Sequence, residues 1–243
     1  AFPKATLLKI SGCQEKPEYK GHIRVLQHNP LCGRQKRKTQ GRIVRLPDKL
    51  IGELLKLPDK SDFVGNRDWV MLLLQIDCAI RPSEALGLLP GDLDLDRGSL
   101  VVSASCAKTR EARTLPISER TSRALRIWLA EREARKIPTS VPLFCSIDGS
   151  PISENTWYRR LCEYGEKLNT HIRPYDLRHY AAMAYYENTN HDIFRLQALL
   201  GHSTLEMTQR YVRVCGSGLV AEHDNYSPLR SFSKELAELE KCA

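Results

Sequence analysis

Three side chains in the last third of the chain are of the types that hold and attack a phosphate group. Arg178 follows Pro-Tyr-Asp-Leu, His202 follows Leu-Leu-Gly, and Tyr211 follows Thr-Gln-Arg. A guanidinium can hold two phosphate oxygens at once. An imidazole can hydrogen-bond one of them, and an activated phenol hydroxyl can attack phosphorus. In this order, the three residues predict chemistry on a phosphodiester.

These motifs resemble the carboxyl-terminal signature of the tyrosine recombinases, the phage-integrase family of DNA strand-exchange enzymes. The resemblance covers roughly residues 42–230 and implies roles for further positions. Arg81, in Ile-Arg-Pro-Ser-Glu-Ala-Leu-Gly-Leu, matches the first catalytic arginine, and Glu84 matches the acidic residue that supports it. Lys108 precedes Glu-Ala-Arg-Thr-Leu-Pro-Ile and matches the mobile lysine that acts as general acid for the 5′ oxygen.

The resemblance also assigns the three residues that first point to phosphate chemistry. It implies that Arg178 is the second catalytic arginine, that His202 hydrogen-bonds the phosphate and that Tyr211 is the nucleophile. Taken alone, each of these residue types is more often a surface charge, a turn residue or a partly buried ring. Matches in the same order and local context favour the catalytic interpretation.

One position departs from the family pattern. The family usually has His or Lys three residues before the second arginine, where this chain has Tyr175. A phenol titrates near pH 10 and an imidazole near 6.5, so Tyr175 is predicted to be a poor base at neutral pH. We expect it to hydrogen-bond the scissile phosphate or Tyr211 and to contribute by position. His171 and His179 are not expected to replace it.

The fold expected around these residues is mainly helical, with a small three-stranded antiparallel sheet at one edge. An apolar stripe over 46–55 predicts a helix, and Asn66 is a candidate cap for a second helix that is apolar on nearly every side. Pro82 should begin a short helix that runs to Gly87, with Arg81 at the junction before it. Strand signals and a charged turn occupy 93–117.

Local signals mark the ends of later helices. Ser118 and Ser153 are expected at the start of two helices. Gly201 is suited to a helix C-terminus, and Ser203 with Glu206 would form a capping box for the next helix. His202 would thus be fixed by backbone geometry between two caps.

Three parts of the chain are distinguished by pattern. Residues 1–41 are predicted to be a linker or the remnant of an amino-terminal DNA-binding region, residues 42–227 the catalytic domain, and residues 228–243 a tail that docks on a neighbouring copy. Basic residues in the first part and on one helix could contact DNA, with a solvated surface as the alternative. The predicted DNA contacts are Arg34, Lys36, Arg37, Lys38, Arg159, Arg160 and Lys167.

The composition agrees with a polyanionic partner. Lys and Arg outnumber Asp and Glu by 37 to 29, for a net charge of +8. The eight cysteines are scattered without zinc-ligand spacing, so neither a metal site nor a cofactor is expected. The scattered cysteines also favour a reducing compartment. No long uncharged apolar run predicts a membrane span. We therefore expect a cytoplasmic, nucleoid-associated protein.

The resemblance implies a site-specific recombinase or integrase that cuts and rejoins double-stranded DNA without metal through a 3′-phosphotyrosyl link. Such enzymes act as tetramers on DNA, and we expect a phage or other mobile element as the source. The alternatives are a type IB topoisomerase-like nicking-closing enzyme and a catalytically silent DNA-binding protein of the same fold. Neither the target sequence nor the choice among integration, excision and resolution can be read from the chain.

Overall fold

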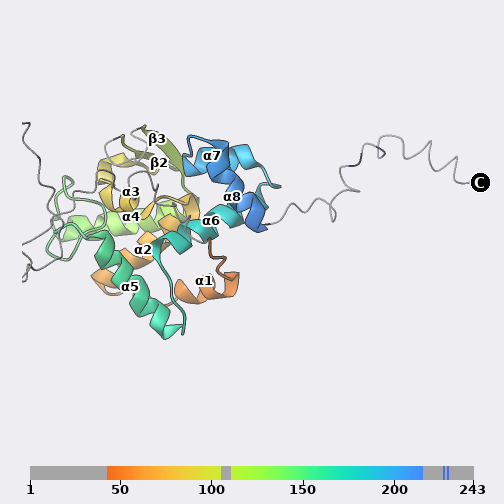
Figure 1. Cartoon of the computed structure of the whole chain (residues 1–243). Helices are drawn as coiled ribbons and strands as arrows, with labels where there is room; N and C mark the ends of the chain where they lie inside the picture. The colour runs from red at the N-terminus through yellow and green to blue at the C-terminus, as the bar shows by residue number, and fades with distance from the viewer. Residues whose placement is uncertain (1–42, 105–110, 216–226, 228, 230–243) are drawn as a thin grey trace, which may run out of the picture. The chain divides into compact units, whose positions relative to one another are not determined.

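The computed structural model describes residues 43–104, 111–215, 227 and 229. These residues confirm the prediction of a mainly helical fold with a small three-stranded antiparallel sheet (Figure 1). The elements are, in chain order, α1 (Asp48–Leu54), α2 (Phe63–Cys78), α3 (Pro82–Gly87), the 3-10 helix η1 (Pro90–Asp92), β1 (Leu93–Asp94), β2 (Ser99–Val102), β3 (Arg113–Pro116), α4 (Glu119–Ala134), α5 (Glu154–Lys167), α6 (Pro174–Asn188), α7 (Ile193–Leu200) and α8 (Leu205–Cys215).

The apolar helix α2 lies in the core and packs against both α4 and α6. The carboxylate of Asp62 caps it by accepting hydrogen bonds from the backbone N–H groups of Val64 and Gly65, each at 3.1 Å. The prediction that Asn66 is the cap is therefore wrong. Asn66 lies inside the helix and donates its side-chain amide to Glu131 of α4 at 2.6 Å.

The junction between α2 and α3 has the predicted form. Ala79 ends α2 in a left-handed conformation with φ 49°, and Arg81 precedes α3 in an extended conformation. Pro82 then begins α3, which ends at Gly87. A proline ring preorganises the first helical residue and disfavours helix at the residue before it, so Arg81 is held at the junction.

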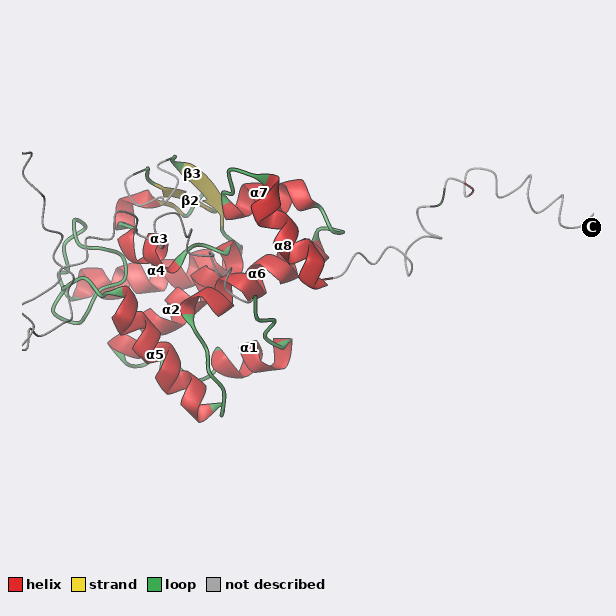
Figure 2. Ribbon diagram, in the orientation of Figure 1, coloured by secondary structure: helices red, strands yellow, loops and turns green. Residues whose placement is uncertain are grey.

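The sheet places the start of β3 close to the later helices. Leu93 pairs with Leu100, Leu100 with Leu115, and Val102 with Arg113. Figure 2 shows the strands at the edge of the molecule beside α3 and α7. Buried Leu100, Val102 and Leu115 attach the sheet to the core, which fixes the backbone from which Arg113 projects.

The serine caps of α4 and α5 are confirmed. The hydroxyl of Ser118 accepts from the backbone N–H of Thr121 at 3.3 Å, and that of Ser153 accepts from Thr156 at 3.1 Å. Trp157 of α5 is fully buried and donates its indole N–H to Gln75 of α2 at 2.7 Å.

Helices α6, α7 and α8 pack on one another and carry the signature motifs. Gly201 ends α7 in the left-handed conformation with φ 60°, as predicted. The N–H groups of Gly201 and His202 bond to the carbonyls of Ala198 and Gln197, which is the Schellman pattern. Helix α8 begins at Leu205, so Thr204 rather than Ser203 immediately precedes it.

Among the described residues, no helix is both long and apolar enough to cross a membrane.

Candidate active site

A buried ion cluster holds the first candidate arginine. The Glu84 carboxylate has no solvent exposure and accepts from Arg81 Nη1 at 2.7 Å. It also accepts from both terminal nitrogens of Arg113, at 2.9 and 2.6 Å, in a two-pronged contact. A further bond joins the Arg81 backbone N–H to Glu84 at 3.1 Å. Glu84 thus fixes both the backbone and the guanidinium of Arg81.

The charge state of Glu84 follows from these partners. Burial raises the pKa of this carboxyl, but hydrogen bonds from Arg113 and Arg81 outweigh burial and lower the pKa below its usual range. The carboxylate is therefore ionised and offsets one of the two guanidinium charges. Sequence reasoning missed Arg113, because its contact with Glu84 joins residues 29 positions apart.

Arg178 is buried and held by the ends of two helices. Its Nη2 donates to the carbonyl of Leu200, the last residue of α7, at 2.9 Å. Its Nη1 donates to the carbonyl of Ala79, just after α2. Burial, and then the charge of Arg81, lower the pKa of Arg178 to about 10. The guanidinium therefore keeps its positive charge at neutral pH.

His202 follows the glycine that ends α7. Its Nδ1 lies 3.0 Å from the hydroxyl of Thr208, a fully buried residue of α8. Burial, followed by the charges of Arg178 and Arg81, lowers the pKa of His202 to about 4. The imidazole is therefore neutral near pH 7 and is fixed both by its backbone and by Thr208.

Tyr211 is the buried tyrosine at the centre of this group, with 4% of its surface exposed. Its ring stacks on that of His202 with centroids 6.3 Å apart. Burial raises the pKa of the phenol, while Arg178 and Arg210 act in the opposite direction. The hydroxyl is thus protonated at neutral pH, and nearby positive charge would stabilise its anion.

The Tyr211 hydroxyl has a close neighbour on α6. Nδ1 of His179 lies 3.0 Å from this hydroxyl, a contact that the expectation that His179 does not replace Tyr175 had not included. Tyr175 is 44% exposed, and its ring centroid is 6.5 Å from that of His179. Among the described residues, no hydrogen bond joins Tyr175 to Tyr211. The signal for His179 was its position beside Arg178, four residues after Tyr175 on the same helix face.

The predicted DNA contacts on α5 separate into two kinds. Arg159 and Lys167 are exposed. Arg160 instead turns to Asp68 of α2, with Nε 2.7 Å from the fully buried carboxylate. It also donates to the hydroxyl of Tyr164 at 2.9 Å. Arg160 is therefore partly committed to neutralising a buried carboxylate, while 28% of its side chain stays exposed.

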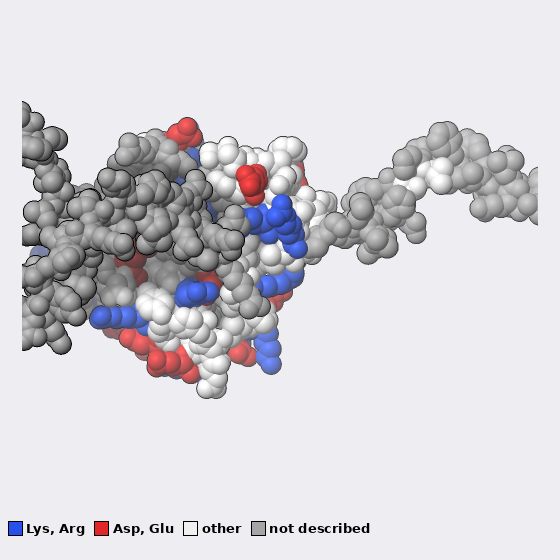
Figure 3. Space-filling model, in the orientation of Figure 1, with Lys and Arg blue, Asp and Glu red and all other residues white. Residues whose placement is uncertain are grey.

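Several predicted site residues lie outside the described residues. They are Arg34, Lys36, Arg37, Lys38 and Lys108. On the face drawn in Figure 3, basic side chains occur in several places among acidic ones.

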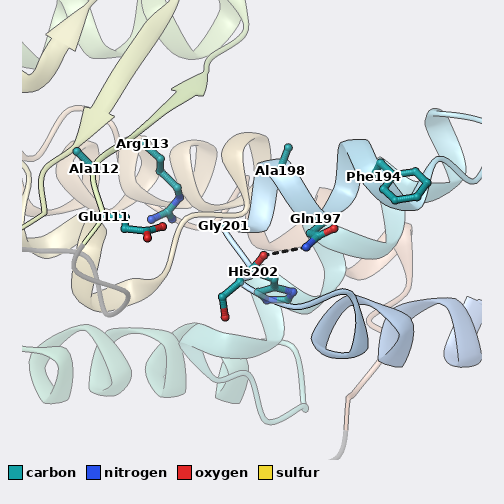
Figure 4. A pocket seen from close by; sticks show the side chains of 9 residues that line it. Glu111, Ala112, Arg113, Phe194, Gln197, Ala198, Gly201 and His202 are labelled. Carbon is teal, nitrogen blue, oxygen red and sulfur yellow. Dashed lines mark hydrogen bonds between the residues drawn. The ribbon is translucent and has the colours of Figure 1, made fainter.

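A hollow of about 310 Å³ opens beside the candidate site (Figure 4). One wall comes from the start of β3 with Glu111 and Arg113, and the other from α7 and the turn after it, with Gln197 and His202. The side-chain amide of Gln197 donates to the carbonyl of His202 at 3.1 Å and so braces this turn. The hollow gives a path from the surface to His202.

A buried tyrosine beside two arginines and a histidine, in a mainly helical domain with a small sheet, is typical of enzymes that exchange DNA strands through a tyrosine. The chain belongs to the phage integrase family, whose model matches residues 45–216.

Curated relatives agree with this membership. The chain is 32% identical over 204 residues to the tyrosine recombinase XerC of Azotobacter vinelandii (strain DJ / ATCC BAA-1303), covering 83% of this chain and 67% of the relative. It is 32% identical over 206 residues to XerC of Pseudomonas savastanoi pv. phaseolicola (strain 1448A / Race 6), covering 84% and 67%. The chain thus spans about two thirds of the length of these relatives.

Solved structures share the fold. XerA recombinase matches with a TM-score of 0.64 at 23% identity, covering 76% of this chain and 65% of that chain. XerH bound to difH substrate matches with a TM-score of 0.59 at 24% identity, covering 69% of this chain and 49% of that chain. The Tn1549 transposon integrase in complex with circular intermediate DNA matches with a TM-score of 0.61 at 21% identity, covering 71% of this chain and 63% of that chain.

Proposed function

We propose that this chain is the catalytic part of a site-specific recombinase that cuts and rejoins double-stranded DNA through Tyr211. The observation that carries the proposal is the buried Tyr211, whose hydroxyl lies close to the charge of Arg178 and whose ring stacks on that of His202. The XerH and Tn1549 neighbours bound to DNA support DNA as the partner.

In the proposed reaction, the Tyr211 oxygen attacks the scissile phosphorus and the bond to the 5′ oxygen breaks. The product is a 3′-phosphotyrosyl link and a 5′-hydroxyl, which gains its proton from Lys108. Arg81, Arg178 and His202 bind the non-bridging oxygens, where negative charge grows in the transition state. The 5′-hydroxyl of a partner strand then attacks the link and releases Tyr211, so bond energy is conserved.

The remaining parts of the chain have proposed roles in assembly. Residues 42–227 form the catalytic domain, and residues 1–41 are a linker or the remnant of an amino-terminal DNA-binding region. Residues 228–243 dock on a neighbouring copy within a tetramer on DNA. A phage or other mobile element is the proposed source of the enzyme, and the nucleoid in the cytoplasm is its proposed place of action.

A nicked suicide substrate tests the proposed function, because loss of a short 5′-hydroxyl strand traps the covalent complex. The wild-type protein should form an adduct that maps to Tyr211, and Tyr211→Phe should bind the same DNA without forming one. Tyr185→Phe is the matched control and should react as the wild type does. An adduct on Tyr185, Tyr186 or Tyr226 would contradict the assignment.

A two-site assay separates recombination from the alternatives. Exchange of flanking markers between two DNA molecules supports recombination, whereas relaxation of one supercoiled circle without exchange would indicate a topoisomerase-like enzyme. DNA binding without any covalent adduct would indicate a silent DNA-binding protein.

A further inference from the structure

The attacking tyrosine must lose a proton, and among the described residues His179 is well placed to accept it. Nδ1 of His179 lies 3.0 Å from the Tyr211 hydroxyl, and the two rings have centroids 5.7 Å apart at 53°. Tyr175, at the position where the family resemblance implies this kind of role, is 44% exposed.

The direction of the hydrogen bond follows from the groups around the hydroxyl. Arg178 also interacts with the Tyr211 hydroxyl, and a guanidinium can only donate. Burial raises the pKa of Tyr211, so the phenol keeps its proton at neutral pH. With the imidazole proton on Nε2, the hydroxyl donates to Nδ1 of His179 while the charge of Arg178 lies nearby.

We propose that His179 is a catalytic residue that orients the Tyr211 hydroxyl and accepts its proton during attack on the phosphate. This inference rests on the proposed function. As the bond between the Tyr211 oxygen and phosphorus forms, the O–H bond breaks and the proton moves to Nδ1 of His179. The bond between phosphorus and the 5′ oxygen breaks on the opposite side, and that oxygen gains its proton from a separate donor.

The surroundings of His179 suit this role. Burial lowers its pKa to about 4, with Arg178, Arg210 and Arg173 acting in the same direction and Asp176 opposing them. The imidazole is therefore neutral at neutral pH, so one of its two ring nitrogens has a lone pair that can accept a proton. Its proton affinity should rise when the phosphate brings negative charge beside it.

The experiment measures the first-order rate of covalent joining at saturating protein on the suicide substrate. His179→Leu removes the acceptor, and we expect the rate to fall by about a hundredfold with DNA affinity within twofold of wild type. His179→Asn keeps an oxygen near the place of Nδ1, so it should recover part of the orientation and react faster than His179→Leu. His171→Leu is the matched control at an exposed histidine and should react at the wild-type rate.

A second substrate carries sulfur in place of the bridging 5′ oxygen, which removes the need for a proton donor to the leaving group. It should leave the His179→Leu defect in place while restoring a Lys108→Ala variant. A His179→Leu rate within threefold of wild type, rescue of His179→Leu by sulfur, or a His179→Asn rate no higher than that of His179→Leu would each overturn the proposal.

A measurement on the wild-type protein avoids any effect of substitution on folding. Nitrogen NMR at pH 7 should show Nδ1 of His179 without a proton and Nε2 with one. A protonated Nδ1 would overturn the proposal. Failure of the wild type to form any adduct would instead contradict the proposed function.

Discussion

Glu84 is the residue on which the placement of Arg81 most directly depends. Its carboxylate is fully buried between Arg81 and Arg113. Removing one partner of a buried ion pair leaves charge that neither water nor protein compensates, which costs more than an exposed pair contributes. Arg113 should therefore matter for stability and for the position of Arg81.

Arg113→Ala is expected to lower the free energy of unfolding by about 3 kcal/mol, because Glu84 loses two charged hydrogen bonds. Urea unfolding measures the loss. Arg97→Ala is the matched control: the Arg97 side chain is 86% exposed and lies 3.7 Å from Asp94, so its removal should cost about 0.5 kcal/mol or less. Equal losses in the two variants would show that the Glu84 cluster has no special role.

Sequence reasoning could propose site residues that belong to local motifs, but it missed contacts made across the fold. Arg81 and Arg178 could be proposed because short segments around them match a family pattern. The contact of His179 with Tyr211 spans 32 positions and depends on how α6 packs on α8. No local pattern contains that information.

Among the elements, the end of α7 places two requirements on one residue. Gly201 adopts φ 60°, which residues with a Cβ atom rarely adopt. A Cβ atom at this position would lie 2.7 Å from Cδ of Arg113. The same glycine therefore ends the helix before His202 and makes room for the side chain that holds Glu84.

Gly201→Ala should lower the free energy of unfolding by about 2 kcal/mol or more, from the left-handed conformation and the contact with Arg113. It should also slow covalent joining, since His202 and Arg113 shift. Gly52→Ala is the control, because Gly52 lies within α1 with nothing near its missing Cβ, and this change should stabilise by about 1 kcal/mol. Thermal unfolding of both variants checks the opposite signs.

Helix ends were predictable wherever a single residue decides them. Pro82, Ser118, Ser153 and Gly201 act through their own side chains or backbone freedom. The predicted cap of α2 was misplaced because the true cap, Asp62, lies in a segment that is less apolar than the centre of the helix. The apolar pattern therefore predicted the centre of α2 well and the first residue of α2 poorly.

At the scale of the whole molecule, burial of two neutral histidines links stability to pH. Burial is the largest cause that lowers the pKa of His179 and of His202 to about 4, below the ordinary value near 6.5. Between these values the unfolded chain binds more protons than the folded one. The free energy of unfolding therefore rises with pH through this window.

We expect the protein to lose on the order of 5 kcal/mol of stability as the pH falls from 6.5 towards 4, with little change from this source above pH 7. The lowered pKa of Glu84 acts in the same direction at lower pH. Urea unfolding at several pH values measures the slope, which His202→Asn should reduce. A slope of opposite sign would contradict the buried neutral histidines.

The salt dependence of DNA affinity tests whether the exposed basic side chains contact DNA. About six phosphate contacts would give a slope near −5 for the logarithm of affinity against the logarithm of salt concentration. Arg159→Ala and Lys167→Ala should each make the slope shallower, because these side chains are exposed. Arg160→Ala should instead destabilise the fold through Asp68 and leave the slope unchanged. A flat salt response would show that the exposed charges are only solvated.

The fold class could be predicted from the chain as a whole, but the use of each charge could not. Helix composition placed Arg159, Arg160 and Lys167 on one face of α5. The neighbouring α2 decides which of them is exposed, since its buried Asp68 draws in Arg160. A single helix contains no sign of that partner.

The hydrogen bonds of Arg178 make the geometry of the site depend on how two helices are placed relative to each other. Its two terminal nitrogens donate to carbonyls beyond α2 and at the end of α7, so the guanidinium is in place only when both helices are. Helices α7 and α8 also bring His202 and Tyr211. A local opening that detaches this pair of helices from the core would thus displace Arg178, His202 and Tyr211 in one event. If Tyr211 is the nucleophile as proposed, partly unfolded protein would lack the assembled site that is needed to nick DNA.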